Sequence, residues 1–259
     1  MPTVVIPASP LAPGITSLAI HVRDTIAGSP LLILHGGWGY GFYPFDAQIA
    51  ALPARRFVIP DRTGYGASPR VSVFPPRFHA AAALEALAVL DALAIDRCTV
   101  WGHSDGAVIA ALLAIAAPTR VDALILEALH LERAKPGSRA FFTMMAEDPD
   151  AFGERVTTRL AADLGPDWRT PIRADGRVWL DIAATPDDDL FDRRLAEITA
   201  PTLVLHGSND PRTEPGELDR LRRDLPHAEL HILDGATHSP HSERDYSGRC
   251  AELVASFLG

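Results

Sequence analysis

The order of apolar and polar positions divides the chain into short strand-like runs and longer helix-like segments. Apolar or alternating runs typical of strands occupy residues 3–6, 17–23, 31–34, 56–60, 98–101 and 122–128. Segments with apolar residues at helical spacing lie between the later runs, at residues 45–52, 78–93 and 107–117. Strands that alternate with helices through short connections predict an α/β protein with a doubly wound, mostly parallel sheet.

The alternation stops after His130 and resumes only near residue 196. Residues 131–195 contain no convincing buried strand, and their short amphipathic segments are interrupted by prolines. Strands follow at 202–205 and 229–233, with helices at 214–223 and 243–257, which brings the predicted sheet to eight strands. We therefore expect a core formed by residues 1–130 and 196–259, with residues 131–195 inserted after strand six as a helical cap. Such a cap would lie over the carboxyl ends of the strands, where open α/β sheets bind ligands.

Composition excludes several classes of protein. The 259 residues carry a formal net charge of −9, which argues against nucleic-acid binding, because that requires clustered Lys and Arg. Residues 1–13 lack the basic segment of a signal peptide, and no apolar run approaches the roughly 18 residues of a membrane span. Cys98 and Cys250 are too few for a disulfide framework and indicate free thiols in a reducing compartment. We expect a cytoplasmic protein with no membrane and no nucleic-acid partner.

The sequence contains no recognisable metal or cofactor motif. The ten histidines are scattered, and none forms a metal-ligand pattern. The acidic run at 186–189 lacks the spacing of a calcium loop and is interpreted as a solvated turn of the cap or the start of a helix. No glycine pattern that cradles phosphates is present either. We therefore expect chemistry that uses neither a metal nor a cofactor.

A serine flanked by glycines stands where the strand at 98–101 gives way to a helix. The stretch reads Gly102-His103-Ser104-Asp105-Gly106. A turn this sharp holds its central residue in a strained backbone conformation, and side chains two positions to either side would collide. This arrangement is typical of a nucleophile elbow, which exposes a reactive serine at the top of a sheet.

On five motifs, each at the end of a predicted strand and in the expected order, the chain resembles the α/β-hydrolase family over essentially its whole length. The motifs are His35-Gly36-Gly37, Asp61-Arg62-Thr63-Gly64-Tyr65-Gly66-Ala67-Ser68, the elbow, His206-Gly207-Ser208-Asn209-Asp210 and Gly235-Ala236-Thr237-His238. The resemblance implies that Ser104 is the nucleophile, His238 the general base and Asp210 the acid that orients it. It also implies an oxyanion hole formed by the backbone N–H of Asp105 and by the His35 loop, at Gly37 with Trp38 beside it.

The expected activity is that of a serine hydrolase that cleaves a small carboxylic ester through an acyl-serine intermediate. An amide, a thioester or a lactone is also within reach of this chemistry. Cofactor-free perhydrolases of the haloperoxidase-like kind and hydrolases of carbon–carbon bonds use a similar triad. A ligand receptor on a hydrolase scaffold is the alternative from another class, because a fold does not fix a function.

Other residues compete for the same roles. His241 lies close to the last strand, but its position three residues further on places it at the start of the final helix. Asp234 competes with Asp210, although it more simply ends a strand. His103 should point away from the nucleophile and serve packing, and structural roles are expected for His35 and His206. Asp61 and Ser68 should hold a turn.

The cap should set the substrate. It contains Phe141, Met145 and Trp179, which we expect to line a mainly apolar pocket together with His130, at the end of the preceding strand. Asp105 has two interpretations. Its Ser-Asp-Gly context is similar to that of the valacyclovirase-like branch, in which an acidic residue here meets the substrate's α-ammonium group, although His103 and Ala107 depart from that branch. Alternatively, Asp105 caps its own helix, where the helix dipole favours an anion.

Overall fold

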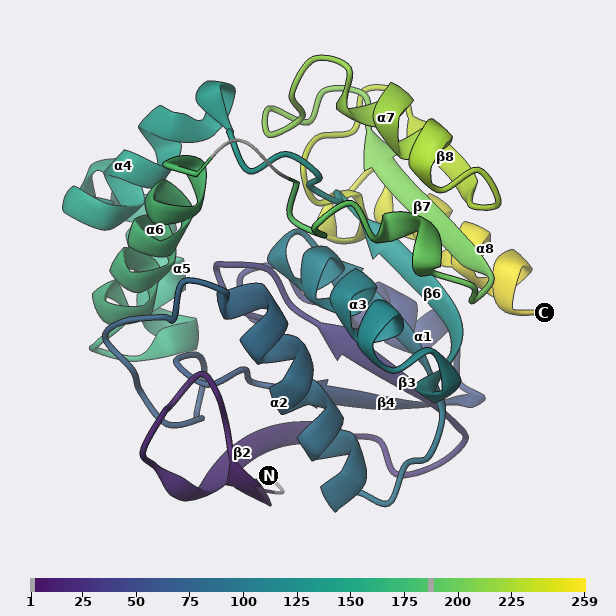
Figure 1. The fold of residues 1–259 in the computed structure, drawn as a ribbon, viewed down its shortest axis with the longest axis horizontal. Coiled ribbons are helices and arrows are strands. Elements are labelled where there is room, and N and C mark those ends of the chain that lie inside the picture. Colours follow the sequence, from purple (N-terminus) through teal and green to yellow (C-terminus); the bar gives the residue numbers. More distant parts are fainter. Residues whose placement is uncertain (1–2, 186–188) are drawn as a thin grey trace.

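One eight-stranded sheet spans the molecule (Figure 1). The computed structural model describes residues 3–185 and 189–259. The strands are β1 (Thr3–Ala8), β2 (Thr16–Asp24), β3 (Ser29–Leu34), β4 (Arg55–Pro60), β5 (Cys98–His103), β6 (Val121–Glu127), β7 (Thr202–Gly207) and β8 (Glu229–Leu233). Their order across the sheet is β1-β2-β4-β3-β5-β6-β7-β8. The predicted eight-stranded, mostly parallel sheet is confirmed.

The parallel part of the sheet places the predicted motifs at one edge. Strand β2 pairs antiparallel with β1 and β4, whereas all pairs from β4 to β8 are parallel. Strands β5 and β7 are buried along their full length, as expected of strands covered on both faces. Because parallel strands end at the same edge, the loops after β3, β5, β6, β7 and β8 meet there.

Helices cover both faces of the sheet (Figure 1). Helices α2 (Phe78–Ala92) and α3 (Asp105–Ala116) pack on one face and share the larger apolar core with β1, β2 and the cap. Helices α1 (Asp46–Ala51) and α8 (Ser247–Leu258) pack against each other on the opposite face, around Phe45, Trp101 and Cys250. The continuous apolar runs in the sequence predicted strands that are covered by helices on both faces, and β5 and β7 are such strands.

Three helices inserted after β6 form a cap, in agreement with the prediction. They are α4 (Arg139–Glu147), α5 (Glu154–Leu164) and α6 (Arg169–Ala183), and they stand beside the sheet at the left of Figure 1. Helices α4 and α6 pack closely, because Gly176 of α6 leaves room for the backbone of Phe142 and Ala146. The acidic turn expected at 186–189 lies largely outside the described residues.

The carboxyl-terminal part differs from the expected boundaries by a few residues. Helix α7 (Glu217–Asp224) begins three residues later than expected, and α8 begins at Ser247 rather than at 243. A short 3₁₀ turn, Pro240–Ser242, occupies the loop before α8. This turn carries His241, which is therefore not part of the final helix.

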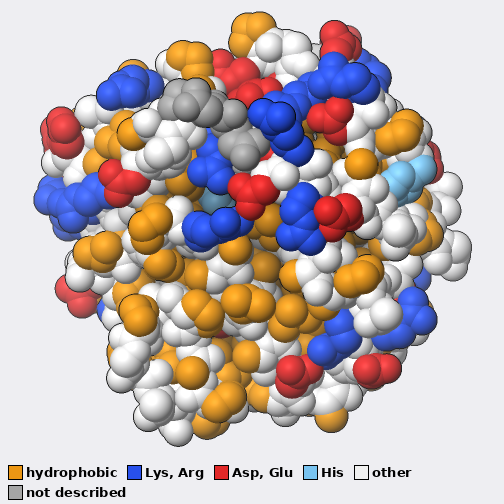
Figure 2. Space-filling model, viewed as in Figure 1, with side chains coloured by type: hydrophobic (Ala, Val, Ile, Leu, Met, Phe, Trp, Pro, Cys, Tyr) orange, Lys and Arg blue, Asp and Glu red, His pale blue; other side chains and the backbone are white. Residues whose placement is uncertain are grey.

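The surface is mixed in character. On the face seen in Figure 2, apolar side chains gather over the lower half, while acidic and basic side chains intermix over the upper half. No helix among residues 3–185 and 189–259 is long and apolar enough to cross a membrane.

Candidate active site

Ser104 stands at the sharp turn between β5 and α3. Its backbone has φ 56° and ψ −122°, a left-handed value that a serine rarely adopts. A β-carbon on Gly102 would lie 2.0 Å from the carbonyl oxygen of Gly106, and one on Gly106 would lie 1.8 Å from that of Leu34. Both glycines are therefore required by close backbone approach, as the elbow motif predicted.

Three side chains from separate loops form a continuous hydrogen-bonded chain. The hydroxyl of Ser104 lies 2.9 Å from Nε2 of His238, in the loop after β8. Nδ1 of His238 lies 2.9 Å from both carboxylate oxygens of Asp210, in the loop after β7. The geometry allows the imidazole to accept the serine proton at Nε2 while Nδ1–H donates to the carboxylate.

Asp210 is held as a carboxylate. Burial alone would raise its pKa, but the charge and hydrogen bond of His238, the backbone N–H of Arg212 and His206 outweigh burial and lower the pKa to about 2. His206, whose Nε2 lies 2.6 Å from the hydroxyl of Thr213, stands 3.6 Å from the same carboxylate. Asp210 therefore stays ionised over the whole neutral range.

A layer of buried polar side chains supports the loop that carries His238. The carboxylate of Glu127, the last residue of β6, accepts hydrogen bonds from the backbone N–H and from Nδ1 of His241, at 3.0 and 2.8 Å. Trp101 donates to its other oxygen at 3.2 Å. His103 lies 3.1 Å from the carbonyl oxygen of His238. His241 thus faces Glu127 rather than Ser104, and this layer positions the loop that carries His238.

These buried groups also form a cluster of metal-ligand type. One ligand atom from each of His103, Glu127 and His241 lies within 4.8 Å of the others. The carboxylate of Glu127 already accepts three hydrogen bonds, and the ring of His241 stacks on Phe45 with centroids 3.8 Å apart. Glu127 and His241 are therefore already paired with each other, and Nε2 of His103 lies against the carbonyl oxygen of His238, which fits a structural network better than a metal centre.

The residues expected to be structural occupy structural positions. Asp61 accepts from the backbone N–H of Ala67 at 2.9 Å and from Nδ1 of His21 at 2.7 Å, and the hydroxyl of Ser68 accepts from the backbone N–H of His21. Asp61 takes the predicted turn role, whereas the hydroxyl of Ser68 links this loop to β2. His35 is buried, and its Nε2 accepts the backbone N–H of Arg62 at 3.2 Å. Asp234 points to Ser208 at 3.3 Å and not to His238.

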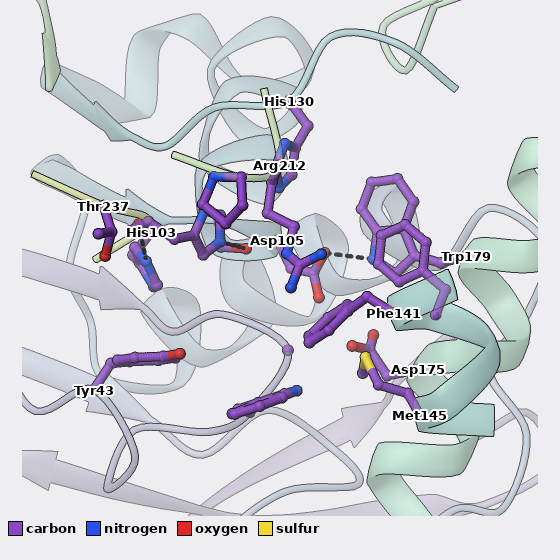
Figure 3. Close-up of a pocket in the computed structure, with 16 residues that line it drawn as sticks. Tyr43, His103, Asp105, His130, Phe141, Met145, Asp175, Trp179, Arg212 and Thr237 are labelled. Atoms are coloured by element: carbon purple, nitrogen blue, oxygen red, sulfur yellow. Dashed lines mark hydrogen bonds between the residues drawn. The ribbon is translucent and has the colours of Figure 1, made fainter. Parts of the chain in front are cut away.

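A cavity of about 230 Å³ lies over Ser104, between the sheet edge and the cap. Figure 3 shows the side chains around it, with those of the cap helices at the right. All the residues expected to bind substrate line this cavity, and so do Gly37 and Trp38. Six further lining residues were not foreseen: Tyr43, Phe142, Asp175, Pro211, Arg212 and Thr237. His103, which was expected to point away from Ser104, also lines the cavity.

Asp105 connects the elbow to two helices. One of its oxygens lies 3.2 Å from Nε2 of His79 on α2 and accepts a 2.9 Å hydrogen bond from the indole of Trp179 on α6. Arg62 lies 4.0 Å from the other oxygen. Burial raises the pKa of Asp105, but His79, Arg62 and Trp179 together lower it to about 2. Asp105 stands in the first turn of α3, where the helix dipole favours an anion, but its carboxylate is directed to His79 and Trp179.

Asp175 on α6 brings a second carboxyl group to the same place. A β-carbon on Gly37 would lie 2.2 Å from an oxygen of Asp175 and 2.8 Å from one of Asp105. Burial and the charge of Asp105 raise the pKa of Asp175 well above its ordinary value. Asp175 therefore favours the neutral acid, which can donate to Asp105. One signal in the sequence pointed here, since Asp175 precedes Trp179 by one helical turn.

His130 lies beside the base. Its ring is nearly parallel to that of His238, at an angle of 13° with centroids 5.5 Å apart. Burial, followed by the charges of Lys135 and the neighbouring histidines, lowers the pKa of His130 well below the usual value. The ring is therefore neutral and forms a flat wall of the cavity.

The fold, the elbow and the loop positions define an α/β hydrolase, and the comparison with known families agrees. Residues 31–252 match the alpha/beta hydrolase family, and the chain belongs to that family.

Two curated relatives and one solved structure illustrate the range of similar proteins. The chain is 26% identical to serine hydrolase BPHL of Mus musculus, over 88% of this chain and 78% of that protein. It is 27% identical to 2-hydroxy-6-oxo-2,4-heptadienoate hydrolase of Pseudomonas putida, over 92% of both chains. A thermophilic esterase from Thermogutta terrifontis superposes with a TM-score of 0.73 at 21% identity, covering 100% of this chain and 98% of the other.

Proposed function

We propose that this protein is a serine hydrolase that cleaves a small carboxylic ester through an acyl-serine intermediate. The observation that carries the proposal is the hydrogen-bonded chain from Ser104 through His238 to Asp210, at the floor of a cavity. A serine hydroxyl is a weak nucleophile at neutral pH and needs a base within hydrogen-bond reach. His238 stands at that distance, and Asp210 fixes its tautomer.

The first half of the reaction transfers the acyl group to the enzyme. His238 takes the proton of Ser104 as the oxygen attacks the carbonyl carbon, and the carbonyl π electrons move to oxygen. Backbone N–H groups of Asp105, at the start of α3, and of the Gly37–Trp38 loop stabilise the resulting oxyanion. When the tetrahedral species collapses, the bond to the alcohol oxygen breaks, and His238 returns the proton to that leaving oxygen.

The second half of the reaction frees the enzyme. Water gives a proton to His238 and attacks the acyl carbon, and the second tetrahedral species expels Ser104, which recovers its proton. Asp210 stabilises the imidazolium formed in each half. The pKa of Asp210, lowered to about 2, keeps this carboxylate ionised wherever His238 can act as a base.

A second candidate is hydrolysis of a carbon–carbon bond on the same residues. Relatives with 27% and 28% identity carry the names 2-hydroxymuconate semialdehyde hydrolase and 2-hydroxy-6-oxononadienedioate/2-hydroxy-6-oxononatrienedioate hydrolase. The ester is favoured by a relative of similar identity, 26%, that carries the name pimeloyl-[acyl-carrier protein] methyl ester esterase. The two substrates can be compared directly in one assay.

Covalent labelling tests the proposal. A fluorophosphonate should add its mass to the peptide that contains Ser104, and an activated short-chain ester should release its alcohol in a burst. The Ser104→Ala variant should lose both reactions, with kcat down by roughly 10⁴-fold or more and an unchanged melting temperature. Near-normal turnover by that variant would refute the mechanism. Stoichiometric ligand binding without turnover or labelling would instead identify a receptor on a hydrolase scaffold.

A further inference from the structure

One charged side chain of the cavity has no hydrogen-bond or ion-pair partner among the described residues. Three ionisable acidic or basic residues line the cavity besides its histidines and Tyr43, namely Asp105, Asp175 and Arg212. Asp105 is matched by Arg62, His79 and Trp179, and Asp175 favours its neutral form. Within residues 3–185 and 189–259, the guanidinium of Arg212 makes no hydrogen bond and no ion pair.

The backbone of Arg212 is fixed even though its guanidinium lacks a polar partner. The backbone N–H donates to Asp210 at 2.8 Å, and the carbonyl oxygen accepts from the buried ammonium of Lys135 at 2.9 Å. The side chain then extends from the acid loop to the cap, where its Cζ lies 3.4 Å from the ring centroid of Phe141. Figure 3 shows Arg212 reaching toward Phe141 inside the ring of lining residues. Burial lowers the pKa of Arg212, yet a guanidinium remains charged at every neutral pH.

The catalytic carboxylate nearby, Asp210, favours the charged form of Arg212 through its own charge but does not pair with it. Asp210 is engaged by His238 and His206, and no ion pair links it to Arg212. A partly desolvated guanidinium without an anion is unfavourable, and a ligand carboxylate would satisfy it with two parallel hydrogen bonds. We propose that Arg212 binds a carboxylate carried by the acyl group of the substrate, so that the preferred esters are half-esters of short dicarboxylic acids.

A second cavity favours placing the substrate carboxylate on the acyl group and not on the alcohol. A space of about 400 Å³ opens on the other side of His238, lined by Phe42, Arg159 and Glu243 among others, and it shares Tyr43, Thr237 and His238 with the first. His238 delivers its proton to the leaving alcohol, so the alcohol departs on the side that opens toward this space. The acyl chain then occupies the inner cavity, toward Arg212 and Phe141.

The inference rests on the proposed ester hydrolysis, and a matched pair of substrates tests it. One is the mono-4-nitrophenyl ester of adipic acid; the other is 4-nitrophenyl adipamate, in which an uncharged amide replaces the carboxylate at the same size. The wild-type protein should favour the anionic ester by roughly 10–100-fold in kcat/KM, mainly through a lower KM, as expected of a charge-assisted bidentate contact. Ser104→Ala provides the blank for spontaneous hydrolysis.

Variants separate recognition from structure. Arg212→Met keeps an apolar contact with Phe141 and should abolish the preference, because it lowers kcat/KM far more for the anionic ester than for the amide ester. Arg212→Lys should retain part of the preference, because it keeps the charge but loses the planar fork. Arg159→Met is the matched control, since Arg159 also stacks on an aromatic ring, Phe42 at 4.9 Å, but lies in the outer space. It should leave the preference intact.

Three results would overturn the assignment. They are equal wild-type rates on the two esters, an equal loss on both with Arg212→Met, and loss of the preference with Arg159→Met instead. If neither ester turned over, the hydrolase proposal would fail first. Calorimetric titration of the wild type and of Arg212→Met with adipate would then test carboxylate binding by Arg212 without catalysis. Adipate binding that the substitution does not change, or no adipate binding at all, would refute this role of Arg212.

Discussion

The indole of Trp179 donates a 2.9 Å hydrogen bond to the carboxylate of Asp105, so a cap helix is tied to the residue next to Ser104. The same oxygen faces His79 on α2. Cap, elbow and core helix therefore meet at one buried side chain with 2% of its surface exposed. This contact gives Asp105 a role in joining the cap to the elbow, in addition to its place in the first turn of α3, where the helix dipole favours an anion.

The first prediction concerns Asp105. We expect Asp105→Asn to lower kcat/KM equally, by about 10-fold, for an α-amino acid ester and for its des-amino analogue. The reason is that the carboxylate is already matched by Arg62 and His79 and supports the geometry of the elbow. The assay is a steady-state comparison of the two esters with both proteins. A wild-type preference of tenfold or more for the aminated ester, erased by the substitution, would show ammonium recognition instead.

The second prediction contrasts two histidines in one loop. His238→Ala should reduce kcat by about 10⁴-fold with little change in stability, because the imidazole is partly exposed and acts on the serine proton. His241→Ala should instead destabilise the fold by about 1–3 kcal/mol, because it removes the side-chain hydrogen bond to the buried carboxylate of Glu127. Both variants require kcat from initial rates and free energies of unfolding from urea titrations.

One result would contradict this contrast. An inactive but fully stable His241→Ala protein would indicate that His241, and not His238, is the general base. The conservative change His241→Gln, which can still donate to Glu127, should recover much of the stability and so separates loss of the hydrogen bond from loss of the ring.

Local signals predicted the parts of the site that a short stretch of sequence determines. Glycines around Ser104 and a polar residue after each apolar strand mark turns and strand ends, and the resemblance to the α/β-hydrolase family then named the residues of the candidate site. Parallel strands then bring those ends to one edge. The fold follows from the same period-two and period-3.6 patterns.

What the sequence could not predict depends on contacts between distant segments. Glu127 and His241 are 114 positions apart, and their buried pair sets the role of His241. Asp175 lines the pocket because α6 packs close to Gly37, a contact between segments far apart in the sequence. Arg212 follows Asp210 by two positions, but its lack of an acidic partner is a property of the packed cap and not of the motif.

The last prediction uses the pair of carboxyl groups beside Gly37. Asp175 is 2% exposed, and burial together with the charge of Asp105 holds its pKa well above the usual value in the folded protein. The folded state therefore binds more protons than the unfolded state once the pH exceeds the unfolded pKa, near 4. Stability should decrease as the pH rises through the interval between the unfolded and folded pKa values, by up to about 1.4 kcal/mol per pH unit.

The Asp175→Asn variant removes this titration and keeps a donor for Asp105. Its free energy of unfolding, measured with urea from pH 4 to pH 8, should match that of the wild type near pH 4. Above that pH it should exceed the wild-type value by a growing margin, because the amide never ionises. Asp181→Asn, an exposed change on the same helix, is the control and should run parallel to the wild type. A constant difference between Asp175→Asn and wild type across the range would mean that Asp175 is ionised at neutral pH, so that Arg212 would no longer be the cavity's one unmatched charge.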